Sequence, residues 1–233
     1  MIARRAVLLA ATLAAAVAVP LVVRGGDESP PSDAHTLRRG QAILAEVRQR
    51  PPATLVFGDS IVEGTTIDTL CGEPALAAGA WGARLADLAM IAPKIAAEAR
   101  PKRIVVAVGI NDTRFHTPTD PTAFAAAYRA LIEPWRAAGI AVSVATLAPV
   151  VRDRDLGDRH FDTARAKRLN AAIRALAADF GLTVVPFDTL PRAPGGGLDP
   201  ALAPDGVHPN AEGYRAWHAI LEKAVCGAVP AKP

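Results

Sequence analysis

Short β-rich apolar runs alternate with longer amphipathic segments along this chain. Five runs have the content of strands in a parallel sheet, and apolar residues three and four positions apart mark five helices between them. The alternation predicts right-handed crossovers and an α/β fold, a three-layer α/β/α sandwich with a doubly wound parallel sheet. The predicted strands are 54–57, 74–79 (the weakest), 103–109, 140–147 and 182–187, and the predicted helices are 37–48, 83–97, 121–138, 164–180 and 211–225.

One domain at residues 34–233 accounts for these elements, with no internal repeat and no second domain, and we expect a monomer. A hydrophobic content of 51% supplies enough apolar surface for a core. The net charge of +3 comes from 26 basic and 23 acidic residues that are dispersed along the chain, with no Lys/Arg-rich run. A nucleic-acid partner is therefore not expected.

The first residues form a separate segment. Residues 1–23 combine two arginines with a long apolar run, and the polar residues 24–33 follow as a flexible linker. An A-x-A pattern at Ala16 and Ala18 favours a cleaved signal peptide, whereas the length of the run also suits a tilted membrane anchor. Either alternative predicts export, to the periplasm or outside the cell.

Cys71 and Cys226 are the only cysteines of the chain. In an oxidising compartment a disulfide between them would join the C-terminal helix to the region after the first strand, and the alternative is two unpaired thiols. Neither cysteine has a second Cys or a His at ligand spacing, so no metal site is expected.

Ser60 follows the first predicted strand in the stretch TLVFGDSIVEG. Ligands of open parallel sheets bind beyond the carboxyl ends of the strands, and a hydroxyl at a helix start lies near unpaired N–H groups that favour developing negative charge. Of the four serines, Ser60 alone occupies a strand exit. It is therefore the candidate nucleophile, with ordinary turn chemistry as the alternative.

His208 is the histidine best placed to serve that serine, because Asp205 precedes it by three residues in DGVHPN. We expect this segment to form the first turn of the C-terminal helix, where the carboxylate can accept from Nδ1 and leave Nε2 free to take a proton. The alternative is a helix-capping cluster.

Asn111 follows the strand predicted at 103–109, in GIND. If that strand neighbours the first, the Asn111 amide and the Ser60 hydroxyl can reach one carbonyl group, and the amide can donate to its oxygen. A turn formed by Asn111 and Asp112 is the alternative.

Four segments, taken in order and spacing, resemble the motif blocks of the SGNH hydrolases, the GDSL esterases and lipases. The first departs from the family pattern by having Ile61 where Leu is usual, and the second by having Ala77 where Asn is frequent. The segments are GDSI at 58–61, AAGAWGARLADL at 77–88, GIND at 109–112 and DGVH at 205–208.

The resemblance implies a flavodoxin-like three-layer fold and catalysis without a metal or cofactor. Ser60 would attack an ester carbonyl, His208 would take its proton and pass it to the leaving alcohol, and Asp205 would orient His208. The resemblance also implies an oxyanion hole formed by the backbone N–H groups of Ser60 and Gly79 with the Asn111 side chain. Gly82 competes with Gly79 for that role.

The expected substrates are carboxylic esters of small molecules or saccharides. Because the chain is compact and has no long apolar lid segment, short-chain acyl or acetyl esters are favoured. Six apolar residues beside the strand ends are candidates for an acyl pocket or for core, namely Ile61, Val62, Trp81, Ile110, Phe115 and Val207.

Three alternatives remain. An O-acyltransferase would use the same triad with another hydroxyl as acceptor, and a non-catalytic cell-envelope binding protein could keep the fold. Flavin or nucleotide binding is disfavoured, because no GxGxxG or GxxxxGK follows a strand, and the glycine run at 195–197 lies in a Pro-rich loop.

Overall fold

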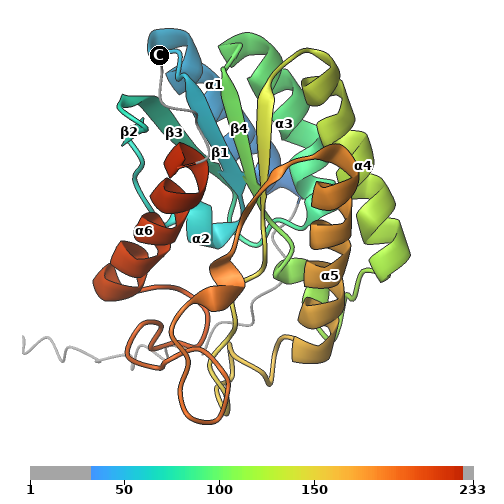
Figure 1. Cartoon of the computed structure of the whole chain (residues 1–233), viewed down its shortest axis with the longest axis vertical. Helices are drawn as coiled ribbons and strands as arrows, with labels where there is room; N and C mark the ends of the chain where they lie inside the picture. The colour runs from blue at the N-terminus through green and yellow to red at the C-terminus, as the bar shows by residue number, and fades with distance from the viewer. Residues whose placement is uncertain (1–32, 228–233) are drawn as a thin grey trace, which may run out of the picture.

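A six-stranded sheet forms the centre of the protein, in the order β2-β3-β1-β4-β5-β6. The computed structural model describes residues 33–227 (Figure 1). All neighbouring strands are parallel except β2 and β3, which pair antiparallel. The strands are β1 Thr54–Gly58, β2 Thr69–Leu70, β3 Glu73–Gly79, β4 Arg103–Ala107, β5 Ala141–Ala145 and β6 Thr183–Val185.

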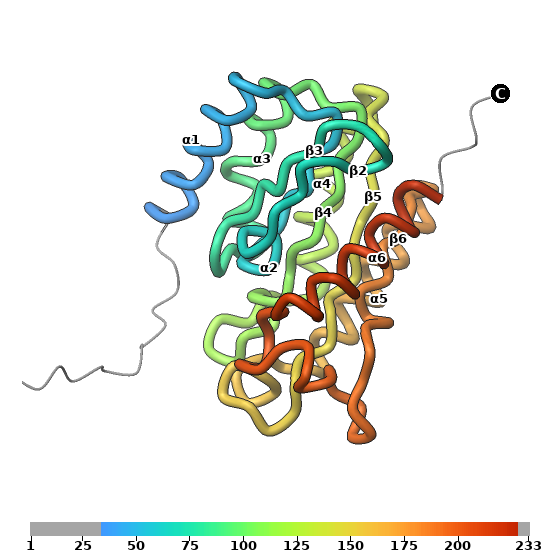
Figure 2. The backbone as a smooth tube through the Cα atoms, turned by 90° about the vertical axis from the view of Figure 1, so that its left-hand side faces the viewer, coloured from blue at the N-terminus to red at the C-terminus, as the bar shows by residue number. Residues whose placement is uncertain are grey.

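Helices cover both faces of this sheet, which makes three layers (Figures 1 and 2). On one face α1, α3, α4 and α5 lie side by side and enclose the larger apolar core. On the other face α6 packs over a smaller core that also receives α2. The helices are α1 Asp33–Gln49, α2 Ser60–Glu63, α3 Leu85–Ala99, α4 Pro121–Ala137, α5 Thr163–Phe180 and α6 Ala211–Gly227, with single 3₁₀ turns at Asn111–Thr113 and Phe187–Thr189.

The predicted fold class is confirmed, and all five strands and five helices predicted from the sequence occur within a few residues of their expected bounds. β2 was not predicted, and α2 was expected only as a helical turn beginning at Ser60, because elements of two and four residues are too short to show a period. The predicted strand 103–109 is longer than β4, which ends at Ala107. The next residue, Val108, is apolar and buried although it lies in the loop, so the sequence pattern does not mark the end of the strand. Polar side chains define several helix starts, as where Asp162 accepts from Arg165 N–H at the start of α5.

The predicted signal or anchor segment 1–23, and the linker 24–33 apart from its last residue, lie outside the described residues. Within 33–227, no helix combines the length and apolar character that a membrane crossing needs.

Three connections hold α6 against the segment that follows β1. The Tyr214 hydroxyl donates to Ile61 O at 2.9 Å, and the Thr65 hydroxyl lies 2.8 Å from His218 Nε2. A disulfide joins Cys71 to Cys226 at the end of α6. The loop that precedes α6 is thereby kept beside the carboxyl end of β1, which is where the predicted site residues lie.

Candidate active site

Ser60 lies where the fully buried strand β1 turns into α2. A Cβ on Gly58 would collide with the Val62 side chain and with the carbonyl oxygen of Ala107, so only glycine permits the sharp exit from the strand. The Asp59 carboxylate then accepts from Ile61 N–H at 3.0 Å and caps α2. Ser60 is the first residue of α2, as predicted, and its side chain is only 6% exposed.

The sequence predicted that Asp205 and His208 lie in the first turn of the last helix. This prediction is wrong, because both residues lie in the loop before that helix. Asn210 caps α6 instead, accepting from the N–H groups of Glu212 and Gly213 at 3.0 Å. Asp205 is therefore not the helix cap. Its Oδ1 accepts from the backbone N–H of His208, which folds the loop into a tight turn and brings the two side chains together.

One chain of hydrogen bonds joins these three side chains. Asp205 Oδ2 lies 2.7 Å from His208 Nδ1, and His208 Nε2 lies 2.9 Å from Ser60 Oγ. An imidazole that donates from Nδ1 to the carboxylate has Nε2 free to accept from the hydroxyl. This arrangement can remove the serine proton as the oxygen attacks an electrophile.

The charge of Asp205 suits that arrangement. Partial burial acts to raise its pKa, but the N–H groups of Val207 and His208 and the imidazole all donate to its oxygens and hold the pKa below the ordinary value. A carboxylate therefore faces Nδ1 at neutral pH, where it can orient the ring and stabilise an imidazolium.

Asn111 leaves β4, the neighbour of β1, at the same edge of the sheet. Its side chain is 2% exposed, and Nδ2 donates one hydrogen to Ala83 O at 3.0 Å. An amide nitrogen carries two hydrogens, so the second is left for another acceptor.

A small hollow opens between Ser60, Asn111 and His208. Its volume is about 10 Å³, roughly the space of one water molecule. Three predicted pocket residues line it, namely Trp81, Ile110 and Val207, while Val62 is buried in the core. Sequence reasoning missed Leu156 and Phe161, because their loops carry no periodic pattern and are brought to the hollow only by folding.

Trp81 forms one wall of the hollow by stacking on the imidazole of His208, with ring centroids 4.6 Å apart and an interplanar angle of 24°. Its backbone N–H is held by the carboxylate of Glu63. Glu63 also lies 3.6 Å from Arg39 Nε of α1. The loop after β3 is thus anchored on both α1 and α2, a contact set that no sequence motif indicated.

The sequence profile of the GDSL-like lipase/acylhydrolase family matches residues 56–216. The chain belongs to this family. The matched range includes every residue that lines the hollow. Membership of this family makes the protein an enzyme that hydrolyses ester bonds.

Solved structures show the same fold as this acylhydrolase. A GDSL-like lipase from Bacteroides thetaiotaomicron is 20% identical with a TM-score of 0.67, over 84% of this chain and 100% of that one. An acetyl xylan esterase is 23% identical with a TM-score of 0.64, over 74% and 99%. A lipase/acylhydrolase from Enterococcus faecalis is 19% identical with a TM-score of 0.62, over 77% and 98%. No curated protein matches the chain significantly.

Gly79 does not lie as its predicted oxyanion role requires. It is the last residue of β3 and pairs with Gly58, while the next N–H, that of Ala80, donates to Gly58 O. Since successive N–H groups point to opposite edges of a strand, the Gly79 N–H points away from β1 and Ser60. Its carbonyl accepts from Arg39. The geometry thus argues against Gly79.

Gly82, the competing candidate for the oxyanion hole of the acylhydrolase, is better placed. It lies between Trp81, whose ring contacts His208, and Ala83, whose carbonyl accepts from Asn111. Its backbone has φ +65°, a conformation that favours glycine. The loop around Gly82 therefore runs between the imidazole and the amide.

Two acids beside the site have other partners. Asp59 caps α2, and Asp112 accepts from Leu85 N–H at 3.0 Å and from the Thr119 hydroxyl at 2.7 Å. Burial raises the pKa of Asp59 to about 7 and also raises that of Asp112. Within residues 33–227, no three His, Cys, Asp or Glu side chains gather as metal ligands.

Proposed function

We propose that the chain is a serine esterase that cleaves short-acyl esters through Ser60, His208 and Asp205. His208 Nε2 takes the hydroxyl proton as Ser60 Oγ bonds to the ester carbonyl carbon. The same proton passes to the leaving alcohol as its C–O bond breaks. Water, deprotonated by His208, then releases the carboxylic acid and restores the hydroxyl. The unbroken chain of hydrogen bonds from Asp205 through His208 to Ser60 is the observation that carries this proposal.

Three donors can hold the oxyanion in this proposal. The backbone N–H of Ser60, at the start of α2, and that of Gly82, beside Trp81, supply two. The Asn111 amide supplies the third from the hydrogen that it does not use on Ala83 O. Because these groups are held by the fold before substrate arrives, they do not need to reorganise as charge develops.

The size of the hollow supports a small acyl group. A volume of about 10 Å³ suits a methyl group and is too small for a long alkyl chain. Trp81, Ile110, Phe161 and Val207 surround it with rigid apolar surface. Acetyl esters are therefore the proposed substrates.

A fluorophosphonate probe and p-nitrophenyl acetate together test the nucleophile. The wild type should be labelled and should hydrolyse the ester, and Ser60→Ala should lose both the label and at least about 10⁴-fold in kcat. Ser143→Ala, which removes a hydroxyl within β5, is the control and should keep both. Labelling of Ser60→Ala at the wild-type rate would refute the proposed nucleophile.

A series of p-nitrophenyl esters from acetate to dodecanoate tests the acyl pocket. We expect kcat/KM to be highest at two to four carbons and to fall steeply with longer chains. A maximum at long chains would contradict the small hollow as the acyl site.

We further propose that the protein acts outside the cytoplasm. The Cys71–Cys226 disulfide supports this, because such bonds persist in oxidising compartments. Cell fractionation should recover the protein in the periplasm, the medium or the membrane, with both thiols unavailable to alkylation until reduced. A cytoplasmic protein with two free thiols would contradict the proposal.

A further inference from the structure

A second and much larger cavity lies beside the catalytic hollow, beyond the carboxyl ends of β5 and β6. Its volume is about 360 Å³, and its wall comes from the loop after β5, the first half of α5 and residues 188–197. Ile110 and Phe161 line both spaces and pack in one apolar cluster. The two spaces therefore adjoin at these two side chains, which places the cavity near the alcohol part of an ester bound at Ser60.

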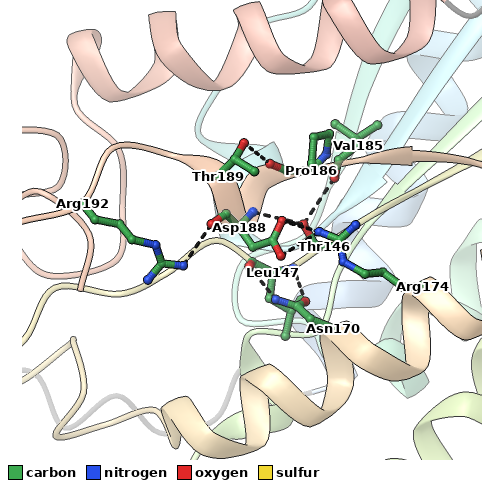
Figure 3. A network of polar contacts seen from close by, with 9 residues as sticks. All are labelled: Thr146, Leu147, Asn170, Arg174, Val185, Pro186, Asp188, Thr189 and Arg192. Carbon is green, nitrogen blue, oxygen red and sulfur yellow. Dashed lines mark hydrogen bonds and ion pairs between the residues drawn. The ribbon is translucent and has the colours of Figure 1, made fainter. Parts of the chain in front are cut away.

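A polar network shapes the inner side of the cavity (Figure 3). Both carboxylate oxygens of Asp188 accept from Arg174 at 2.8 Å, and one also accepts from the Thr146 hydroxyl. Arg192 approaches from the other side and donates to the backbone carbonyl of Asp188 at 2.9 Å. The carboxylate of Asp188 is thus paired with Arg174, a residue that does not line the cavity. Arg192 contacts only the neutral backbone carbonyl of Asp188 and not its carboxylate.

The glycine run at 195–197 forms the outer side. Arg192 donates to Gly196 O, and Arg152 donates to Gly195 O at 2.7 Å. A Cβ on Gly197 would collide with the side chain of Arg152 and the carbonyl of Val150. Glycine at position 197 therefore lets the loop pass close to Arg152. The loop therefore places two guanidinium groups along the cavity.

The wall carries a surplus of positive charge. Three basic residues line the cavity, namely Arg152, Arg192 and Lys167, which is exposed on the first half of α5. Only two acidic residues line it, Asp158 and Asp188. Asp188 is neutralised by Arg174, and Asp158 lies 3.8 Å from Arg152 Nε. Among residues 33–227, neither Lys167 nor Arg192 is within ion-pair distance of a carboxylate. An anionic group entering the cavity would meet two uncompensated cations.

We propose that this cavity binds the alcohol part of the ester, and that this part is a saccharide carrying an anionic group. The inference rests on the proposed esterase activity and adds the substrate class. The volume suits a sugar residue, the hydroxyl of Thr163 and the loop backbone offer partners for sugar hydroxyls, and Lys167 and Arg192 attract the anion. A substrate of this kind would present a small acyl group to the hollow and its charge to the cavity.

Two acetylated methyl glycosides that differ only in the group at C6 test the proposal. One is the glucuronoside, with a carboxylate, and the other is the neutral glucoside. The wild type should have the higher kcat/KM on the glucuronoside, and this preference should shrink as salt rises from about 0.01 M to about 1 M, where the Debye length falls from about 30 Å to about 3 Å.

Lys167→Glu tests the cavity itself. It should lower kcat/KM on the glucuronoside by about three- to tenfold, mainly through KM, and change the neutral ester less than about twofold. Lys94→Glu on α3, which makes the same charge change away from this cavity, should leave the preference unchanged.

Equal kcat/KM on the two glycosides in the wild type, or an equal loss in Lys167→Glu and Lys94→Glu, would overturn the proposal. Such a result would leave the esterase standing as long as p-nitrophenyl acetate is hydrolysed by the wild type and not by Ser60→Ala. Absence of that hydrolysis would instead overturn the proposed function itself.

Discussion

The catalytic hollow and the neighbouring cavity share a wall but are built on opposite principles. The hollow is small, and Ser60 and Asn111 in it are at most 6% exposed and hydrogen-bonded to His208 and to Ala83 O, respectively. The cavity, at about 360 Å³ against about 10 Å³, is much larger and carries long charged side chains on its surface. Rigid buried dipoles suit the stabilisation of a transition state, whereas exposed charges suit recognition of a substrate. In the proposed esterase this difference would assign the chemistry to the hollow and the selection of the substrate to the cavity.

Removing the amide of Asn111 should have the largest effect of the variants that sharpen this comparison. Asn111→Ala should lower kcat by about 10²–10³-fold, because one oxyanion donor is lost. Steady-state kinetics should show the same loss on neutral and anionic esters, since the hollow does not distinguish them. A nearly unchanged kcat would refute the donor role, and a loss confined to anionic esters would break the division between the two spaces.

Trp81 should matter less, because it acts on His208 through packing. Stacking of aromatic rings contributes about 0.5–1.5 kcal/mol, so Trp81→Ala should lower kcat on p-nitrophenyl acetate by about two- to tenfold.

Trp81→Phe is the matched control and should restore most of the loss, since a smaller ring can still cover the imidazole. If the alanine variant instead changed KM alone, Trp81 would contact the substrate without positioning His208.

Asp59, the buried acid that precedes Ser60, should affect the stability of the fold and not the selectivity for substrate. Burial raises the pKa of Asp59 in the folded protein to about 7 from an ordinary value near 3.8. Between these values the folded state holds the proton that the unfolded state has lost. The free energy of unfolding should therefore fall as pH rises through this window, by up to about 1.4 kcal/mol per pH unit from this group.

Asp59→Asn removes that titration. The free energy of unfolding should therefore fall less between pH 4 and pH 7 in this variant than in the wild type. Denaturant unfolding at several pH values measures the difference. Asp155→Asn, at a side chain that is 92% exposed, is the control and should parallel the wild type. Parallel curves for Asp59→Asn as well would show that the Asp59 carboxyl is not held protonated in the fold.

Much of the fold followed from local patterns. Apolar runs and helical periodicity predicted every strand and helix of the doubly wound sheet longer than four residues, because burial on one or two faces imposes those patterns directly on the sequence. Spacing also predicted the approach of Asp205 to His208, although the contact forms in a loop turn and not in the helical turn that was expected.

The sequence by itself determined the fold class and the candidate residues Ser60, His208, Asp205 and Asn111, because strand exits and short-range spacing are local properties. Only the tertiary structure decided that the Gly79 N–H points away from Ser60, since its direction depends on the pairing of β3 with β1. It also decided how large the hollow beside Ser60 is and where the cations of the neighbouring cavity gather. Those features are made by loops brought together from distant parts of the chain, and loop contacts leave no period in the sequence.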